Sequence, residues 1–296
     1  MSAIATILVN YNGIDDTIAT IESLKKSTVK TDVIVVDNAS KNEEGKKIEN
    51  LFSDITVITN SRNVGFAAAN NIGIKKAISM NCDYVLVLNN DVEIAPSMIE
   101  KLLDYGKRGY VVAPLMFYHS NKNIIWFGGG RINKHTGASE HLNMNKHDYG
   151  ELIPMECSFL TGCCMMIPVN VINTVGFFDE SYFMYCEDND YSIRLMNNGV
   201  PMIINTDAVL WHKVGRSTGG GYNMFNTYYN TRNRVLCIKK NKGFFSWTAL
   251  RVTYITRMIR MVQFMLTRKK YWKAVWWGVI DGLRDVNGET TRDLRM

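Results

Sequence analysis

The sequence predicts an α/β fold in which helices cover both faces of a mainly parallel sheet. In the first third of the chain, short runs of Val, Ile and Leu alternate with amphipathic stretches, and such continuous apolar runs are typical of buried parallel strands. The expected strands cover residues 4–10, 32–37, 55–59 and 84–89. The expected helices between them cover residues 14–27, 41–51 and 64–80.

The remaining two thirds of the chain have a different pattern. Residues 110–180 contain short strand patterns and glycine-rich turns such as residues 126–132, and a helix is expected after the acidic residues near position 188. Long helical patterns rich in Arg, Lys, Trp and Met follow residue 222. With 296 residues, the chain is long enough for one large domain or for one domain and a half.

Composition and charge disfavour several classes of protein. The first residues enter an apolar run without the basic region or cleavage site of a secretory signal, so we expect a cytosolic protein. The six cysteines form no C-x-x-C pair, and we expect reduced thiols rather than disulfides or a zinc site. The net charge of +6 is uneven, because residues 222–296 contain 15 basic and 4 acidic residues and residues 1–221 carry a net charge of −5.

Polar residues follow each of the four expected strands. Ligands of parallel α/β sheets bind beyond the carboxyl ends of the strands, so these residues are expected to meet at one rim. They are Asn10, Tyr11 and Asn12, then Asp37 and Asn38, then Asn60 to Asn63, and finally Asn89, Asn90 and Asp91. A dinucleotide-binding domain is the first alternative, but the turn after the first strand, NYNGIDD, has one glycine where that class requires G-x-G-x-x-G.

Several sequence blocks together resemble the family 2 glycosyltransferases, and within them the bacterial rhamnosyltransferase-type branch. The blocks are LVNYNG, VVDNAS, NVGFAAANNIGI, VLNNDVEI, FLTGCCMMIP, GFFDESYFMYCEDNDYSIRLMNNG and WHKVGRS. They cover about residues 4–220, and YYNTRNRVLCIKKN is a weaker match after them. The resemblance implies a GT-A fold, a nucleotide-sugar donor, a divalent metal ion and inversion at the anomeric carbon.

The resemblance also implies a division of the chain. Residues 1–222 would form the GT-A catalytic domain, with a nucleotide-sugar half at about 1–115 and an acceptor half at about 116–222. Residues 223–296 would form a basic, amphipathic, helical C-terminal region.

Asp91 and His212 are the expected metal ligands. Departure of a nucleoside diphosphate places charge on phosphate oxygens, and a cation is needed to stabilise it. Asp91 follows a buried strand, and His212 resembles the second ligand position of the family, which suggests Mn²⁺ or Mg²⁺. Asn89 stands where many relatives have a first acidic residue. The alternatives are a turn-forming aspartate and a hydrogen-bonded core histidine.

A further set of residues is assigned to the nucleotide sugar by resemblance. Asp37 matches the nucleobase contact, Tyr11 is placed to stack on the base, and Arg216 belongs to a glycine-rich segment that could close over the diphosphate. Structural roles as caps and turns are an equal alternative for Asn38, Asn63 and Asn71. The remaining members of the expected set are Arg62, Asn63, Asn71, Asn89 and Asn90.

Three carboxylates lie close together at Glu187, Asp188 and Asp190. An acceptor hydroxyl needs a base, and Asp188 matches the base position of the family. Glu187 would support that base or contact the acceptor, and Asp190 would orient Arg194. Mutual repulsion of these groups would raise the pKa of the base toward neutral pH. The alternative is an ordinary helix N-terminus with an i,i+4 ion pair between Asp190 and Arg194.

The basic tail contains a candidate membrane helix at residues 245–266. Arg251, Arg257 and Arg260 would each cost roughly 2.5 to 3.5 kcal/mol at the centre of a bilayer, which argues against a spanning helix. Polar and basic residues gather on one side of the helix and Trp, Met and Ile on the other, so we expect a helix that lies in the membrane interface. Residues 268–283 continue this pattern. The alternative is a helix pair packed on the catalytic domain or on a second copy in a homodimer.

Together these features predict a peripheral enzyme on the inner face of the cell membrane. It would transfer a sugar with inversion from a nucleotide-sugar donor to a lipid-linked saccharide acceptor in bacterial surface-polysaccharide synthesis. Resemblance favours dTDP-L-rhamnose as donor, with a UDP-hexose, UDP-N-acetylhexosamine or UDP-galactofuranose as alternatives. A non-catalytic nucleotide-binding or membrane-scaffolding protein is a further alternative. Nucleic acid is a poorer partner for the tail, because Trp and Met on one helix face suit lipid better than stacked bases.

Overall fold

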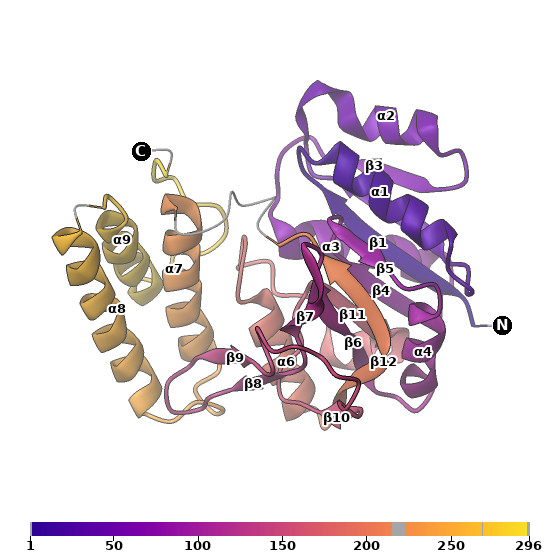
Figure 1. The fold of residues 1–296 in the computed structure, drawn as a ribbon. Coiled ribbons are helices and arrows are strands. Elements are labelled where there is room, and N and C mark those ends of the chain that lie inside the picture. Colours follow the sequence, from indigo (N-terminus) through magenta and orange to yellow (C-terminus); the bar gives the residue numbers. More distant parts are fainter. Residues whose placement is uncertain (1, 215–222, 268, 295–296) are drawn as a thin grey trace.

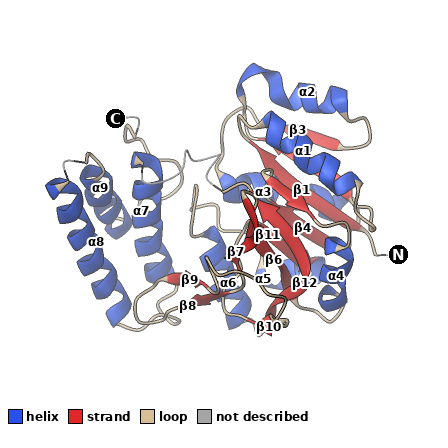
Figure 2. Cartoon of the chain, viewed as in Figure 1, coloured by secondary structure: helices blue, strands red, loops and turns tan. Residues whose placement is uncertain are grey.

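The computed structural model describes residues 2–214, 223–267 and 269–294. It consists of an α/β part built around one large sheet and a group of three C-terminal helices beside it (Figure 1). Helices lie on both faces of the sheet, and the described part of the C-terminal region is helical without strands (Figure 2).

The N-terminal strands form a parallel sheet in the order β3-β2-β1-β4. Their bounds are Ile4–Asn10 for β1, Asp32–Asp37 for β2, Thr56–Thr59 for β3 and Tyr84–Leu88 for β4. Between them lie α1 (Ile14–Lys25), a 3₁₀ turn at Lys41–Glu43, α2 (Glu44–Leu51) and α3 (Phe66–Ser79). The predicted alternation of strands and helices is confirmed. The apolar runs reflect burial on both faces, since most of β1, β2 and β4 is inaccessible to solvent.

The sheet continues through strands of mixed direction. β11 (Cys164–Pro168) is antiparallel to both β4 and β6 (Val111–Tyr118), and β12 (Met202–His212) is parallel to β6. Among the described residues the sheet has ten strands, of which β5 (Val92–Ile94), β7 (Asn121–Phe127) and β10 (Met155–Glu156) lie at its margins. The helices of this half are α4 (Met98–Gly106), α5 (Val169–Val175) and α6 (Glu187–Asn197). β8 (Gly130–Ile132) and β9 (Ser139–His141) form a separate hairpin.

The three C-terminal helices are α7 (Met224–Lys240), α8 (Thr248–Leu266) and α9 (Trp272–Leu283). An Asn223–Asn226 capping box begins α7. Gly278 and Gly282 allow α9 to approach α7 closely, because a Cβ at Gly278 would lie 2.9 Å from the Tyr228 carbonyl oxygen. The guanidinium of the fully buried Arg232 lies over the Tyr229 ring. The helices thus form a packed unit rather than separate extensions.

The two sides of α8 differ in how far they are exposed. Thr253 and Phe264 are buried, whereas Tyr254, Ile255 and Ile259 are exposed. The helix therefore packs through Ala249, Thr253 and Phe264, with Arg257 and Arg260 half-buried, and leaves an apolar side open. In the part of the chain that the structure describes, no helix is long and apolar enough to cross a membrane. The six cysteines are free thiols, and most of them are buried.

Candidate active site

A cavity of about 1330 Å³ lies at the carboxyl ends of β1, β2 and β4. Its walls come from the strand ends, from the start of α6, from the end of β12, from the β8–β9 hairpin, from α7 and α8 and from residues 289–294 after α9. The residues expected from the sequence that line it are Tyr11, Asn63, Asn89, Asn90, Asp91, Glu187, Asp188 and His212. Residues separated by up to 200 positions are thus brought to one site.

Amide side chains form the wall of the cavity at the ends of β2 and β4. The Asn38 amide nitrogen donates to Asn63 Oδ1 at 2.8 Å, and its oxygen accepts from the Val64 N–H at 3.0 Å. The Asn90 amide nitrogen donates to Thr17 Oγ1 at 2.8 Å. Tyr11 is half exposed and extends along the same wall. These hydrogen bonds fix the amides before any ligand binds.

Three of the residues assigned to the nucleotide sugar do not line the cavity. Asp37 is buried behind the rim, where its Oδ1 accepts from the Asn10 amide at 2.7 Å. Asn71 is also buried, and it donates to the Phe178 carbonyl at 2.8 Å and accepts from the Phe178 N–H at 3.1 Å. Arg62 is exposed outside the cavity. Asp37 and Asn71 thus tie neighbouring elements together, and their contact with the nucleotide sugar stays a prediction.

Arg216 lies outside the described residues, so its role over the diphosphate stays a prediction. Asn89 lies at the end of β4, and its backbone N–H donates to the Cys163 carbonyl at 2.8 Å. This bond connects the strand end to the loop that approaches the carboxylates of α6.

Asp91 and His212 are adjacent in space. β5 begins directly after Asp91 and pairs antiparallel with β12, which brings Val92 opposite His212. His212 Nε2 lies 3.1 Å from Asp91 Oδ1, and both side chains are buried. Burial alone would lower the pKa of His212, but Cys163 and Asp91 outweigh burial and raise it to about 10. Because burial also raises the pKa of the Cys163 thiol, Asp91 is the main counter-charge of the imidazole near neutral pH.

This pair has the chemistry of a partial cation site. It supplies one carboxylate oxygen and one imidazole nitrogen, which suits Mn²⁺ or Mg²⁺ when substrate phosphates and water supply the other ligands. No group of three or more His, Cys, Asp or Glu side chains with metal-binding geometry occurs among the described residues. Within the same residues, His212 Nδ1 is buried without a hydrogen-bond partner. The pair thus fits an ion that shares its coordination with a bound substrate.

Glu187 and Asp188 are the first residues of α6, and the Thr161–Cys163 loop contacts Asp188. Asp188 Oδ2 accepts from the Gly162 N–H at 3.2 Å, and Oδ1 accepts from the Asn189 N–H at 2.8 Å. Burial raises the pKa of Asp188 although these bonds act in the opposite direction. Burial, and then the Asp188 carboxylate, raise the pKa of Glu187 well above its ordinary value of 4.5. The two groups form a coupled carboxylate pair whose proton affinity is shifted toward neutral pH.

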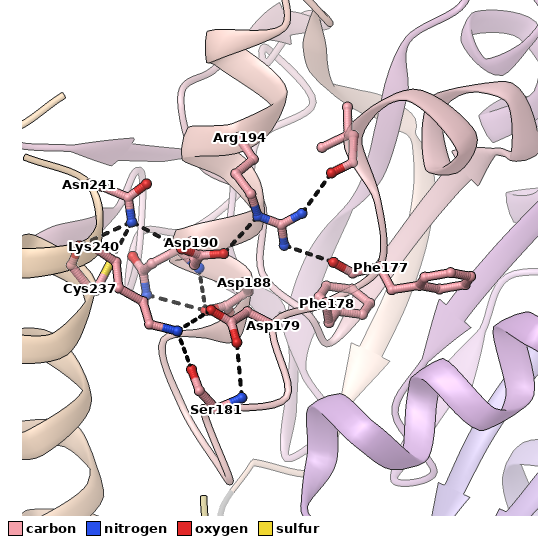
Figure 3. A network of polar contacts seen from close by, with 12 residues as sticks. Phe177, Phe178, Asp179, Ser181, Asp188, Asp190, Arg194, Cys237, Lys240 and Asn241 are labelled. Carbon is pink, nitrogen blue, oxygen red and sulfur yellow. Dashed lines mark hydrogen bonds and ion pairs between the residues drawn. The ribbon is translucent and has the colours of Figure 1, made fainter. Parts of the chain in front are cut away.

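Asp190 has a different role from its two neighbours. Its Oδ2 accepts from Arg194 Nε at 2.8 Å, and its Oδ1 accepts from the Asn241 amide at 3.0 Å. Arg194 also donates to the carbonyls of Val175 and Phe177 (Figure 3). The predicted i,i+4 ion pair is confirmed, and Asp190 is absent from the lining of the cavity. The third carboxylate thus joins α6, α7 and the segment after α5.

The turn before α6 has strained backbone that α7 holds in place. Tyr185 and Cys186 both have positive φ angles, of 70° and 71°, which non-glycine residues rarely adopt. The buried Asn233 amide donates to the carbonyls of Met184 at 2.7 Å and Tyr185 at 2.9 Å. Sequence reasoning missed this contribution of α7, although the weak match of YYNTRNRVLCIKKN was a signal for it.

Sequence comparisons identify relatives whose names describe sugar transferases. Residues 6–176 match the model described as glycosyl transferase family 2. The chain is 26% identical to the low-salt glycan biosynthesis hexosyltransferase Agl10 of Haloferax volcanii, over 98% of this chain and 94% of the relative. It is 24% identical to the dTDP-rhamnosyl transferase RfbF of Shigella flexneri, over 97% of each. It is 27% identical to the N-acetylglucosaminyl-diphospho-decaprenol L-rhamnosyltransferase of Mycobacterium tuberculosis, over 63% of this chain and 68% of the relative.

Solved structures with the same fold are more distant in sequence. The mannosyltransferase PcManGT of Pyrobaculum calidifontis, in complex with GDP-Man and Mn²⁺, superposes with a TM-score of 0.60 at 12% identity, over 95% of this chain and 87% of that one. GalNAc-T7 with UDP, GalNAc and Mn²⁺ superposes with a TM-score of 0.62 at 17% identity, over 81% of this chain and 48% of that one. These similarities identify the α/β architecture as the GT-A fold.

Proposed function

Because the chain belongs to glycosyl transferase family 2, we propose that it transfers a sugar, with inversion, from a nucleoside-diphosphate sugar to a lipid-linked saccharide. The observation that carries this proposal is that the Glu187–Asp188 pair and the Asp91–His212 pair line one cavity at the strand ends. One pair can accept a proton, and the other can hold a cation beside a diphosphate. Proton uptake and cation binding, which the reaction requires, are thus assigned to two different pairs of side chains.

In the proposed reaction Asp188 is the general base. The acceptor hydroxyl oxygen forms a bond to the anomeric carbon while the bond from that carbon to the diphosphate oxygen breaks, and Asp188 takes the hydroxyl proton. A positioned base of this kind contributes a factor of about 10² to 10⁴. The raised pKa of the carboxylate pair favours proton uptake. Glu187 supports the base, and the departing group leaves as a nucleoside diphosphate.

The donor end of the cavity is proposed to lie at the amide wall. Tyr11 would stack on the nucleobase, and Asn38 and Asn63 would face the nucleoside. Asp91 and His212 would hold Mn²⁺ or Mg²⁺, which when bound supplies positive charge for the departing diphosphate. We propose dTDP-L-rhamnose as the donor, supported by the names of two of the relatives, with UDP-sugars as the alternative.

The acceptor is proposed to be attached to a lipid. The name of one relative specifies a diphospho-decaprenol acceptor, and the exposed side of α8 presents apolar residues beside the exposed Lys269 and Lys270. Such a surface suits a helix in the plane of a membrane, where apolar side chains enter the lipid and lysines meet anionic headgroups. We therefore propose that residues 1–222 are the catalytic part and residues 223–296 place it on the cytosolic face of the membrane.

Nucleotide-sugar hydrolysis tests the central claim. The wild-type protein, incubated with Mn²⁺ or Mg²⁺ and a panel of dTDP- and UDP-sugars, is expected to release nucleoside diphosphate from one of them. Asp188→Asn is expected to lower turnover by about 10² to 10⁴ without loss of nucleotide binding. The control is Asp104→Asn, an exposed carboxylate on α4. A wild-type protein that binds nucleotide but turns over no donor, alone or with membrane extracts as acceptor source, would support the non-catalytic alternative.

A further inference from the structure

Two arginines enter the cavity from the C-terminal helices. Arg234 of α7 and Arg257 of α8 both line it, close to the turn that precedes Glu187. Burial and the carboxylates of Asp188 and Glu187 raise the pKa of the Cys186 thiol, and both guanidinium groups act in the opposite direction. The two positive charges are therefore close enough to the turn before α6 to act on Cys186.

Arg234 lacks a compensating negative charge among the described residues. Its Nη2 donates to the Thr136 carbonyl at 3.2 Å, while its Nε is buried and has no hydrogen-bond partner in the described part of the chain. Burial lowers the pKa of this guanidinium, which shows that its surroundings disfavour the charged form. A half-buried cation with one neutral acceptor is costly unless a ligand supplies negative charge.

The two carboxylates at the start of α6 do not serve as the counter-charge of Arg234. Burial raises the pKa of both Glu187 and Asp188, and no arginine is among the groups that oppose this shift. The pKa values of Glu187 and Asp188 are thus set mainly by burial and by local hydrogen bonds rather than by the two arginines. Cys186 and Cys237 are the groups that favour the charged form of Arg234, and no carboxylate is among them. A ligand anion can therefore supply the negative charge that the surroundings of Arg234 lack.

The arginines and the cation pair act on different cysteines near the carboxylates. Asp91 and His212 interact with Cys163, and the adjacent Gly162 donates to Asp188. The arginines instead act on Cys186, in the turn before α6. A donor diphosphate at Asp91 and a second anion at the arginines would thus contact different residues of the cavity.

Neighbouring contacts hold the arginine side of the cavity in place. The Thr136 carbonyl accepts from both Arg234 and Thr253 of α8, and the Lys134 carbonyl accepts from the Ser246 N–H at 2.9 Å. The loop of the β8–β9 hairpin is thus bonded to both helices. The same α8 that places Arg257 in the cavity exposes its apolar side to the exterior.

We propose that Arg234 and Arg257 form an anion subsite for the phosphate or diphosphate group that joins the acceptor saccharide to its lipid. This inference rests on the proposed function. Guanidinium groups bind phosphate oxygens through paired, charge-assisted hydrogen bonds. An acceptor held there by its phosphate would have its lipid toward the apolar side of α8 and its saccharide toward Asp188.

Binding of a short prenyl diphosphate tests the subsite. Geranyl diphosphate and geraniol are titrated into the full chain by calorimetry, with Mg²⁺ and saturating dTDP or UDP present so that the donor site is filled. We expect the wild-type protein to bind the diphosphate at least about tenfold more tightly than the alcohol, since hydrogen bonds to charged groups contribute about 1.5 to 3 kcal/mol. Arg234→Gln and Arg257→Gln are each expected to lose about tenfold of this preference.

Matched variants separate a specific subsite from a general effect of charge. Arg251→Gln removes the same charge from an exposed position of α8 and is expected to retain the preference. Arg234→Lys keeps the charge and is expected to retain most of it. Thermal melting identifies any variant that does not fold. If Arg234→Gln does not fold, the preference for the diphosphate is compared in Arg257→Gln and Arg234→Lys instead. Equal preference in the wild type and in both glutamine variants overturns the proposal, as does an equal loss in Arg251→Gln.

Donor measurements in the same variants distinguish the two proposals. If Arg234→Gln and Arg257→Gln weaken dTDP or UDP binding as much as geranyl diphosphate binding, the arginines belong to the donor site and the acceptor subsite is rejected. If donor hydrolysis occurs but the wild-type protein does not distinguish the diphosphate from the alcohol, the proposed function holds and this inference fails. If the diphosphate preference is present but no donor is turned over, the proposed function fails and the anion site stands.

Discussion

The two walls of the cavity differ in how their polar groups are paired. On the wall from the strand ends, Asn38, Asn63 and Asn90 bond to one another or to neighbouring elements, so their amides are fixed and neutral. On the wall from α7 and α8, Arg234 carries a full charge with one carbonyl acceptor among the described residues. The fixed amides of the first wall suit the nucleoside that we propose as ligand there, whereas Arg234 on the second wall would be stabilised most by a negatively charged ligand.

The largest expected difference between the walls concerns turnover of the donor. Asp91→Asn removes the carboxylate of the proposed cation pair, so donor hydrolysis with Mn²⁺ should fall by about 10²-fold or more, because a bound cation contributes several kcal/mol. Arg234→Gln, on the other wall, should leave donor hydrolysis within about threefold. Steady-state release of nucleoside diphosphate measures both. Equal losses in the two variants would remove the functional distinction between the walls.

A smaller effect is expected from the contact between α7 and the strained turn. Asn233→Ala leaves the carbonyls of Met184 and Tyr185 without this donor, which should cost about 1 to 3 kcal/mol of unfolding free energy. It should also lower kcat by about tenfold with a smaller change in donor KM, because Glu187 and Asp188 lose their fixed position. Urea unfolding and steady-state kinetics measure these effects. Asn50→Ala, at an exposed position on α2, is the control, and a stable variant with unchanged kcat would contradict the role of this contact.

The outward side of α8 should affect membrane binding and leave the cavity unchanged. Ile259→Glu places a charge on the apolar side, and its binding to vesicles of equal parts phosphatidylglycerol and phosphatidylcholine should weaken by about tenfold, as expected for the loss of one buried aliphatic side chain. Thr256→Glu adds the same charge at an exposed polar position of the helix and should have a smaller effect. Co-sedimentation measures binding. Identical losses would indicate a response to net charge alone.

The smallest expected effect is the pH dependence of stability at the carboxylate pair. The pKa of Glu187 is raised in the folded state, so the folded chain binds more protons than the unfolded chain above the ordinary pKa of 4.5. Its ionisation therefore lowers stability as pH rises from that value through the raised pKa. Glu187→Gln removes this penalty, and its melting temperature relative to wild type should increase between about pH 5 and about pH 8. A difference that stays constant over this range would contradict the raised pKa.

Residues at the strand ends were the most predictable part of the site. Tyr11, Asn63, Asn89, Asn90 and Asp91 line the cavity as their positions after parallel strands suggested, because such strands all end at the same edge of the sheet. Asp37 follows the same rule of position, yet its side chain turns behind the rim to Asn10. A strand end specifies where a residue lies but not which neighbours its side chain selects.

The sequence by itself determined the parallel N-terminal strands, the family and the pairing of Asp190 with Arg194, because these follow from local patterns of burial and spacing. Tertiary structure alone decided which residues of α8 pack inward and that Arg234 and Arg257 line the cavity. An amphipathic pattern predicts that a helix has a polar side and an apolar side. Which side meets the protein depends on the charges and shapes of distant elements, and those are brought together only by folding.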